Sequence, residues 1–359
     1  MPVPDAVPPS GERSAPCTFR VRAPEDFFAF APIMIGFEPE DSIVMLTFGG
    51  HTSFHARIDL PPRRVLTPTV TAELADTLLE PVLRHRVRDL VLLFYSDDRG
   101  ATTRAFRALR RRCRAAGIGL VEALRTDGRR YYPLLATDAD LRTNGVAYDV
   151  TDHPFAAEAV VQGRVVHRSR AAMAAQLDPL PPAVTAVERI LAQPEYAEDP
   201  DLAHRPADLL EAGAWIEDLV RGHVAARTLP ADDDVAELAW LVQVTRLRDA
   251  AWGTMRREDA RQHLELWIHV LRRTPEHLVP PVAALAGWAA WLAGDGALAW
   301  AAVDRCTAVD PDYGLAGLLG GALSRAVPPE LGEPTWDWWA GLSDGPPRGP
   351  GQPRGPVPA

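Results

Sequence analysis

The sequence predicts an N-terminal α/β domain, a mixed sheet with flanking helices, followed by an all-α, tetratricopeptide-like helical domain. Apolar strand patterns alternate with helical ones as far as about residue 177, prolines then cluster between residues 179 and 206, and helical periodicity follows. We therefore divide the chain into a disordered segment 1–16, an α/β domain 17–180, a proline-rich linker 181–206, a helical domain 207–340 and a disordered tail 341–359. Both ends are rich in Pro and Gly and too poor in apolar residues to order themselves.

In the front half, a short helix is predicted from Ala23, with acids in its first turn and an end near Gly36. The apolar run 43–48 and the alternating run 53–60 predict a buried strand hairpinned to a half-exposed one. A helix 70–84, a strand 90–95, a helix 102–116 and a strand 118–124 are predicted next. The order strand, helix, strand with short links predicts a parallel right-handed crossover. Residues 137–152 are predicted as loop, and 156–161 and 169–177 as short helices.

The back half is predicted to be helical throughout, with helices near 235–242, 258–273, 279–293, 297–309 and 313–325. Gly287, Ala299 and Pro311 stand at equal separations, which matches the small residues and the closing proline of a tetratricopeptide repeat. We therefore expect helices 279–293 and 297–309 to pack as a hairpin around the turn at residues 294–296.

The charge composition excludes several classes of enzyme. The chain has 359 residues, 38 of them basic and 48 acidic, a formal charge of −10, and every basic residue is arginine. Without lysine there can be no Schiff base, no pyridoxal phosphate enzyme, no P-loop lysine and no protein-kinase lysine. The acidic balance also argues against nucleic-acid binding by the chain as a whole.

Neither cysteines nor histidines predict a metal site or a cofactor. Cys17, Cys113 and Cys306 are scattered without metal-ligand spacing, and so few cysteines argue against a disulfide framework. His51 and His55 would lie about 13 Å apart along one strand, too far to share an ion. The longest apolar run, 282–293, is too short to span a bilayer. We therefore expect a cytoplasmic protein without metal, cofactor or membrane anchor.

The predicted strand 53–60 carries the first candidate site. Arg57 and Asp59 are two residues apart and so point to one face, with Ser53 and His55 beside them and Ser42 on the neighbouring strand. This face could hold a small anionic ligand, with arginine and serine as donors. The alternative is a solvent-facing ion pair that only fixes the hairpin, and this alternative is favoured.

Asp97 and Asp98 form the second candidate, directly after the predicted strand 90–95. Ligands gather at the carboxyl ends of strands in open α/β sheets, so these carboxylates could hold a metal or a sugar hydroxyl. The favoured alternative is that one of them, or Thr102, caps the next helix.

The helix after Thr102 presents a basic face opposite an apolar one, made by Arg104, Arg107, Arg111 and Arg114. Such a face could dock the phosphates of a nucleotide or a nucleic acid. A solvated face that gains from the helix dipole is the favoured alternative.

Several motifs resemble those of an actinobacterial family, domain of unknown function 4192. In the front half they are Ala23-Pro24-Glu25-Asp26, Pro32-x-x-x-Gly36-Phe37-x-Pro39-x-x-Ser42, Arg57-x-Asp59-Leu60-Pro61 and the helix start Ser169-Arg170. In the helical half they are Arg246-x-Arg248-Asp249 and the segments 294–296 and 310–313. The resemblance spans most of the chain but implies no mechanism, because the family has no established activity.

Taken together, the sequence favours an uncharacterised cytoplasmic interaction or regulatory protein that is non-catalytic. Its helical domain would bind a protein partner, and its α/β domain a small anionic ligand or nothing. The alternative is a hydrolase or transferase of unrecognised type at the Ser42/Arg57/Asp59 or the Asp97/Asp98 edge; nucleic-acid association through the Arg104 to Arg114 face is the weaker alternative. The tryptophans at 336, 338 and 339 would anchor the C-terminus or present a sticky peptide.

Overall fold

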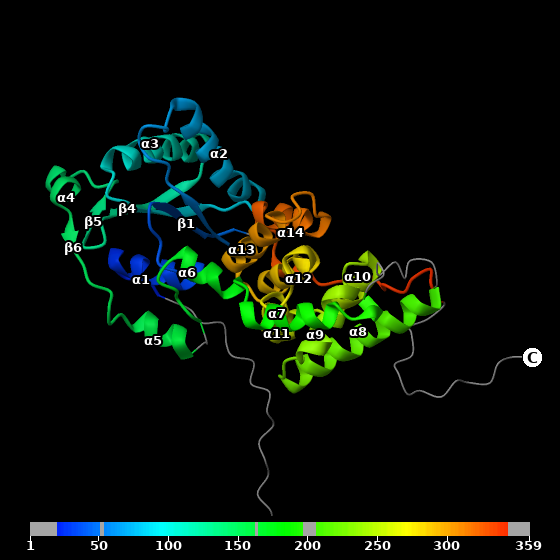
Figure 1. The fold of residues 1–359 in the computed structure, drawn as a ribbon. Coiled ribbons are helices and arrows are strands. Elements are labelled where there is room, and N and C mark those ends of the chain that lie inside the picture. Colours follow the sequence, from blue (N-terminus) through cyan, green and yellow to red (C-terminus); the bar gives the residue numbers. More distant parts are fainter. Residues whose placement is uncertain (1–19, 51–53, 162–163, 197–205, 344–359) are drawn as a thin grey trace, which may run out of the picture.

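The computed structural model describes residues 20–50, 54–161, 164–196 and 206–343. Within them, a sheet with helices on both faces is followed by a group of packed helices (Figure 1). This arrangement agrees with the predicted order of an α/β part before a helical part. The expected disordered segment 1–16, and the tail from residue 344 onward, lie outside the described residues.

The six-stranded sheet has the order β2-β1-β3-β4-β5-β6. The strands are β1 (Ser42–Phe48), β2 (His55–Asp59), β3 (Asp89–Tyr95), β4 (Gly119–Thr126), β5 (Arg130–Pro133) and β6 (Val146–Ala147). β3 and β4 are parallel and every other pair is antiparallel, so the predicted mixed sheet, hairpin and crossover are confirmed. The sequence pattern missed β5 and β6, because strands of four and two residues are too short for alternation to show.

Both faces of the sheet are covered. α2 (Pro68–Arg84) and α3 (Arg99–Ala116) cover one face, where Ile43 and Met45 of β1 point. On the opposite face Val44 and Leu46 pack into the same core as α1 (Pro24–Ile35) and the helical half. A strand buried on both faces reads as a continuous apolar run, which is why β1 shows no alternation.

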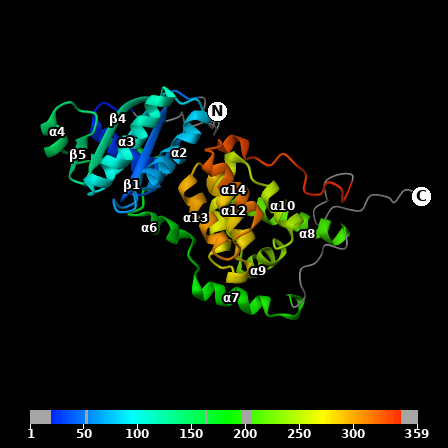
Figure 2. The same ribbon diagram turned by 90° about the horizontal axis from the view of Figure 1, so that it is seen from above.

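Short helices join the sheet to the rest of the chain. They are α4 (Ala139–Asn144), which lies in the stretch predicted to be loop, α5 (Pro154–Val161), α6 (Arg170–Ala174) and the 3-10 turn η1 (Ala175–Leu177). In both views α6 lies between the sheet and the helical half (Figure 2).

Of the expected linker 181–206, the structure describes residues 181–196 and 206, and this part is largely helix. α7 (Pro181–Leu191) and the 3-10 turn η2 (Pro194–Tyr196) fill most of residues 181–196, and α8 (Pro206–Ala226) begins at residue 206. α7 begins with prolines in its first turn, where the missing N–H costs nothing and the fixed φ suits a helix. Proline clustering therefore marked helix starts here rather than an extended linker. α7 packs against α9 and buries Val187 completely.

The helical half is built around one buried helix, α12 (Val279–Leu292), every residue of which is buried. Around it lie α9 (Asp232–Leu241), α10 (Thr245–Gly253), α11 (Ala260–Leu271), α13 (Gly296–Thr307) and α14 (Gly314–Ser324), with the 3-10 turns η4 (Arg257–Asp259), η5 (Glu276–Leu278) and η6 (Pro329–Leu331). A repeat unit contacts only its neighbours along the array, whereas α12 contacts α10, α11, α13 and α14. Tetratricopeptide-like character is therefore not confirmed. No described helix is long and apolar enough to cross a membrane.

The expected hairpin of α12 and α13 is present. Gly294 takes a left-handed φ of 83° in the turn. A Cβ at Gly287 would lie 3.1 Å from Cβ of Ala302 and 2.9 Å from Cδ2 of Leu319, so the absent side chain permits the close approach of the helices. The small residues mark this contact even though the repeat itself is not confirmed.

The segment after η6 is anchored to the helical half, one of the two roles considered for its tryptophans. The Trp338 side chain is 3% exposed, and its ring fills the space above Gly213 of α8. Arg246 donates hydrogen bonds to the carbonyl oxygens of Trp338 and Ala340, at 2.8 and 3.0 Å. Trp336 packs on Trp252 and stays 42% exposed.

Candidate functional site

The main candidate is a depression of about 600 Å³ at the junction of the two halves. Four separate segments line it: the stretch from Phe37 to Asp41, strand β2, the start of α6, and α13 of the helical half. The lining residues are Phe37, Glu38, Glu40, Asp41, Arg57, Asp59, Ser169, Arg170, Ala171, Ala174, Ala301 and Asp304. Ligand sites often lie at such boundaries between structural units.

Arg57 of β2 lines this depression and contacts several of its other residues. Its Nη1 pairs with Oδ1 of Asp59 at 2.5 Å, while its Nη2 donates to Oγ of Ser42 at 2.5 Å and to the Glu40 carbonyl oxygen at 3.4 Å. The guanidinium also lies 5.7 Å from the centre of the Phe37 ring. The structure therefore brings Ser42, Arg57 and Asp59 together as expected, but it buries Arg57 to 14% exposure rather than leaving it on a solvent-facing strand.

Ser42 is not placed to act as a nucleophile. Its side chain is fully buried, its hydroxyl donates to the Glu40 carbonyl oxygen, and it accepts from Arg57. A nucleophilic serine needs a neighbouring base that takes its proton, and a backbone carbonyl cannot do this. These contacts give Ser42 a structural role, in holding the turn before β1 against Arg57.

An ion pair joins the two halves at the edge of the depression. Arg170, the first residue of α6, lies 3.1 Å from Asp304 of α13. Ser169 caps α6, its Oγ accepting from the Ala172 amide at 3.1 Å. This cap orients the short helix, so that Arg170 meets the helical half.

The remaining charged groups in the lining are acidic. Asp41 accepts a hydrogen bond from Oγ of Ser96 at 3.1 Å. Glu38 and Glu40 make no side-chain ion pair within the described residues. Burial raises the pKa of Glu38, as expected for a carboxylate that loses water without gaining a cation. The lining thus carries five carboxylates against two guanidinium groups.

Asp97 and Asp98 lie at the same edge of the sheet, since the start of β1 pairs with the end of β3, but neither lines the depression. Asp98 is the N-cap of α3, its Oδ1 accepting from the amides of Gly100 and Ala101 at 2.8 Å each. These amide hydrogen bonds, that of Ala101 above all, lower the pKa of Asp98. The favoured interpretation of Asp98 as a helix cap is therefore confirmed, while the Asp97 side chain is exposed.

The polar face of β2 is largely covered at His55 and Arg57 and open to solvent only at Asp59. The ring of His55 lies 5.7 Å from the Phe30 ring of α1. Burial, with a smaller effect from Arg164, lowers the pKa of His55 to about 4, so the ring is neutral at pH 7. Helix α1 was expected, but its position over β2 depends on long-range packing that no local pattern records. His51 and Ser53 lie outside the described residues.

The candidate basic residues Arg104, Arg107, Arg111 and Arg114 are exposed on α3. α3 and α2 cover one face of the sheet, and α1 lies on the opposite face. These arginines are therefore on the other side of the sheet from α1. They take no part in the depression at the junction.

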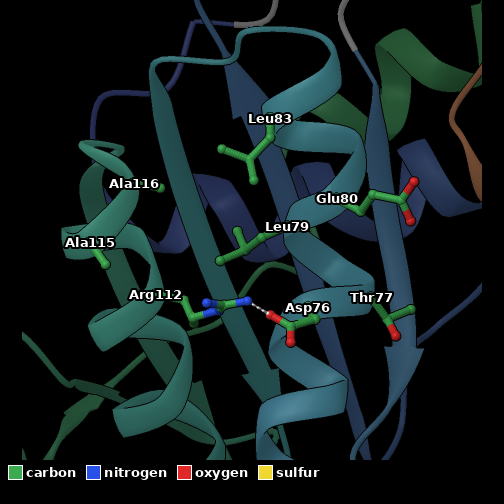
Figure 3. Close-up of a pocket in the computed structure, with 8 residues that line it drawn as sticks. All are labelled: Asp76, Thr77, Leu79, Glu80, Leu83, Arg112, Ala115 and Ala116. Carbon is green, nitrogen blue, oxygen red and sulfur yellow. Dashed lines mark hydrogen bonds and ion pairs between the residues drawn. The ribbon is translucent and has the colours of Figure 1, made fainter.

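A second depression, of about 530 Å³, lies between α2 and α3 on the outer surface (Figure 3). Leu79 and Leu83 of α2 face Ala115 and Ala116 of α3 across it, and Arg112 reaches over to pair with Asp76. Its polar groups are thus already paired or point away, which makes it the weaker candidate site.

Metal-binding and reactive groups are few. No group of three His, Cys, Asp or Glu side chains in the described part of the chain is arranged to hold a metal ion. Cys113 and Cys306 are free and buried, and burial raises the pKa of their thiols to about 11 and about 12. Cys17 lies outside the described residues.

Of the lining, sequence reasoning named only Arg57 and Asp59 as site residues. It missed the other charged and polar residues there, which are Glu38, Glu40, Asp41, Ser169, Arg170 and Asp304. The acids at 38, 40 and 41 lie within the Gly36 to Ser42 motif, so their position in that motif was a usable signal. Asp304 comes from the other half of the chain, and nothing in its own helix distinguishes it.

Comparison with protein families gives one match. A family model described as "Domain of unknown function (DUF4192)" matches residues 24–330. The chain belongs to this family. Comparisons with curated proteins and with solved structures find no match. In this DUF4192 chain, Phe37, Ser42, Arg57, Asp59 and Arg170, which carry the resemblance in the front half, gather at the junction depression. The family description names no activity, so the geometry of that depression must suggest one.

Proposed function

We propose that this DUF4192 chain is a non-catalytic, cytoplasmic binding protein whose junction depression receives an organic cation. The cation is an ammonium or guanidinium group, carried either by a small amine or by an arginine or lysine side chain of a partner protein. The observation that supports this most strongly is the excess of carboxylates over guanidinium groups in the lining.

The charge balance favours a cation. Asp59 and Asp304 are paired with Arg57 and Arg170, which leaves Glu38, Glu40 and Asp41 without an arginine partner in the lining. A cation about 4 Å from one carboxylate gains about 4 kcal/mol at the effective dielectric of a protein surface, before desolvation is subtracted. Two or three such carboxylates around one cation would give a specific site.

The floor of the depression suits the carbon chain of such a ligand. Phe37 and the alanines at 171, 174 and 301 supply apolar surface between the charged groups. Lysine and arginine side chains, and the polyamines, bury their methylene groups on surfaces of this kind while the charged end stays polar.

A small anion, expected from Arg57 in the sequence, is the second candidate. Asp59 is 71% exposed, so an incoming carboxylate or phosphate could displace it from Arg57. The anion would then sit among the unpaired acids Glu38 and Glu40, and this repulsion makes it the weaker proposal.

Ser42 donates to a backbone carbonyl oxygen rather than to a base, which supports a binding role over a hydrolase or transferase that would use Ser42 as its nucleophile. The free thiols of Cys113 and Cys306 agree with a reducing compartment.

Thermal unfolding of the full chain with three probes tests the proposal. Agmatine, which carries both an ammonium and a guanidinium group, should raise the Tm, and glutarate should leave it unchanged. At an agmatine concentration of 100 times Kd, the gain in the free energy of unfolding is about 2.7 kcal/mol. An arginine-containing peptide that raises the Tm far more than agmatine would point to a protein partner. If glutarate stabilises the chain and agmatine does not, the anionic alternative replaces the proposal.

A further inference from the structure

Helix α3 concentrates positive charge on a chain whose formal charge is −10. Its 18 residues include seven arginines and no aspartate or glutamate. All seven are exposed: Arg99, Arg104, Arg107, Arg110, Arg111, Arg112 and Arg114. This patch is separate from the junction depression, so a ligand of α3 is independent of the proposed function.

Two of these arginines are occupied by contacts with the described part of the chain. Arg112 pairs with Asp76 of α2 across the outer groove (Figure 3). Arg104 donates to the carbonyl oxygens of Arg63 and Leu66, at 3.0 and 3.3 Å. These two contacts fix the side of α3 that faces α2.

The outward side of α3 has no such partners. Arg107, Arg110, Arg111 and Arg114 make no side-chain hydrogen bond or ion pair within the described residues. Arg107 with Arg111, and Arg110 with Arg114, are like charges at the i, i+4 spacing, which destabilises a helix. The fold therefore holds a repulsion that a polyanion would relieve.

The burial of α3 decides which kind of polyanion fits. Phe106, Leu109 and Cys113, on the apolar side of the helix, are buried against the sheet. A helix that binds a lipid surface inserts its apolar side, and α3 has none to offer. From Arg107 to Arg114 the helix rises about 10 Å, a length that faces about three successive phosphates of one nucleic-acid strand.

The geometry points to nucleic acid as the ligand of this face: α3 binds the phosphate backbone through Arg107, Arg110, Arg111 and Arg114, without reading sequence. The net negative charge of the chain does not prevent this, because charges more than about 8 Å away are largely screened at physiological ionic strength. Contacts to phosphates position a protein on nucleic acid but carry no sequence information.

Fluorescence anisotropy of the full chain with a labelled duplex DNA of about 20 base pairs tests the inference. Binding should appear at low salt, and log K should fall against log salt with a slope of about −3.5 for four phosphate contacts. The double variant Arg107→Glu with Arg111→Glu should bind at least tenfold more weakly. For this double variant, the slope of log K against log salt should be shallower by about 2.

The matched control is Arg142→Glu with Arg189→Glu, which changes the net charge equally at two exposed arginines on α4 and α7. Circular dichroism checks that both double variants fold. Control binding equal to that of the unmodified chain supports α3 as the site. Equal losses in both variants would show a net-charge effect and overturn the inference, as would no binding at low salt. Flotation with phosphatidylserine vesicles but no DNA binding would show that the face binds lipid instead.

Discussion

Arg57 and Asp59, two residues apart on β2, form an ion pair whose two partners differ greatly in exposure. The guanidinium is 14% exposed and also binds Ser42 and the Glu40 carbonyl oxygen, whereas the carboxylate is 71% exposed. Arg57 therefore belongs to the structure of the junction depression, and Asp59 to its replaceable rim. The solvent-facing ion pair considered from the sequence is therefore right for Asp59 and wrong for Arg57, while the role of Arg57 as a ligand donor stays a prediction.

Truncation of Arg57 should lower stability far more than neutralisation of Asp59. Arg57→Ala removes the donor to the buried Ser42 hydroxyl and one of the two donors to the Glu40 carbonyl oxygen, which costs about 1–3 kcal/mol. Asp59→Asn removes only an exposed partner and should cost less than about 1 kcal/mol. Urea unfolding measures both, and equal losses would show that Arg57 has no structural role beyond the pair.

The contact of Gly213 with Trp338 should control how the C-terminal segment is held. A Cβ at Gly213 would overlap the Trp338 ring, so Gly213→Ala should displace the ring, shift tryptophan emission to longer wavelength and lower the Tm. Gly222→Ala, on the same helix with open space around it, is the control and should stabilise α8 by about 0.5–1 kcal/mol. Unchanged emission and Tm in Gly213→Ala would contradict the anchoring.

His55 should make stability depend on pH between about 4 and 6.5. Burial lowers its pKa from 6.5 to about 4, so in this window the unfolded chain binds a proton that the folded chain does not. The contribution of the neutral His55 ring to the free energy of unfolding is fully present above pH 6.5 and is lost as the pH falls toward 4. It is worth about 3 kcal/mol, since the two pKa values differ by about 2.5 and one pKa unit corresponds to 1.36 kcal/mol.

The stability of His55→Gln should therefore fall less steeply over the same window than that of the unmodified chain. Urea unfolding at intervals from pH 4 to pH 7 gives the two profiles. Parallel profiles would mean that His55 has the same pKa in the folded and unfolded states.

Local patterns predicted the elements of the fold far better than their assembly. The apolar run of β1, the periodic faces of α2 and α3 and the close approach at Gly287 are each recorded in a few neighbouring residues. Strand β6 has only two residues and leaves no such record. Proline clustering misled where prolines occupied the first turn of α7.

The candidate site was predictable only where its residues lie close in sequence. Arg57 and Asp59 are on one strand, and Ser42 is on its hairpin partner. Asp304 meets Arg170 across 134 positions of the chain, through packing of α13 on α6. The unpaired acids Glu38, Glu40 and Asp41 lie together just before β1 and do not depend on that packing. The sequence suggested an anion because Arg57 was considered without them.

Isothermal titration calorimetry with agmatine tests the central claim most directly. Three proteins are titrated: the unmodified chain, the double variant Glu38→Gln with Glu40→Gln, and a control double variant. The control, Glu73→Gln with Glu188→Gln, neutralises two exposed acids outside the depression. We expect agmatine to bind the unmodified chain and the control with equal affinity, and the Glu38/Glu40 variant at least about tenfold more weakly, or about 1.4 kcal/mol. Equal agmatine affinity for all three proteins would contradict it, because the cation would then bind away from the junction.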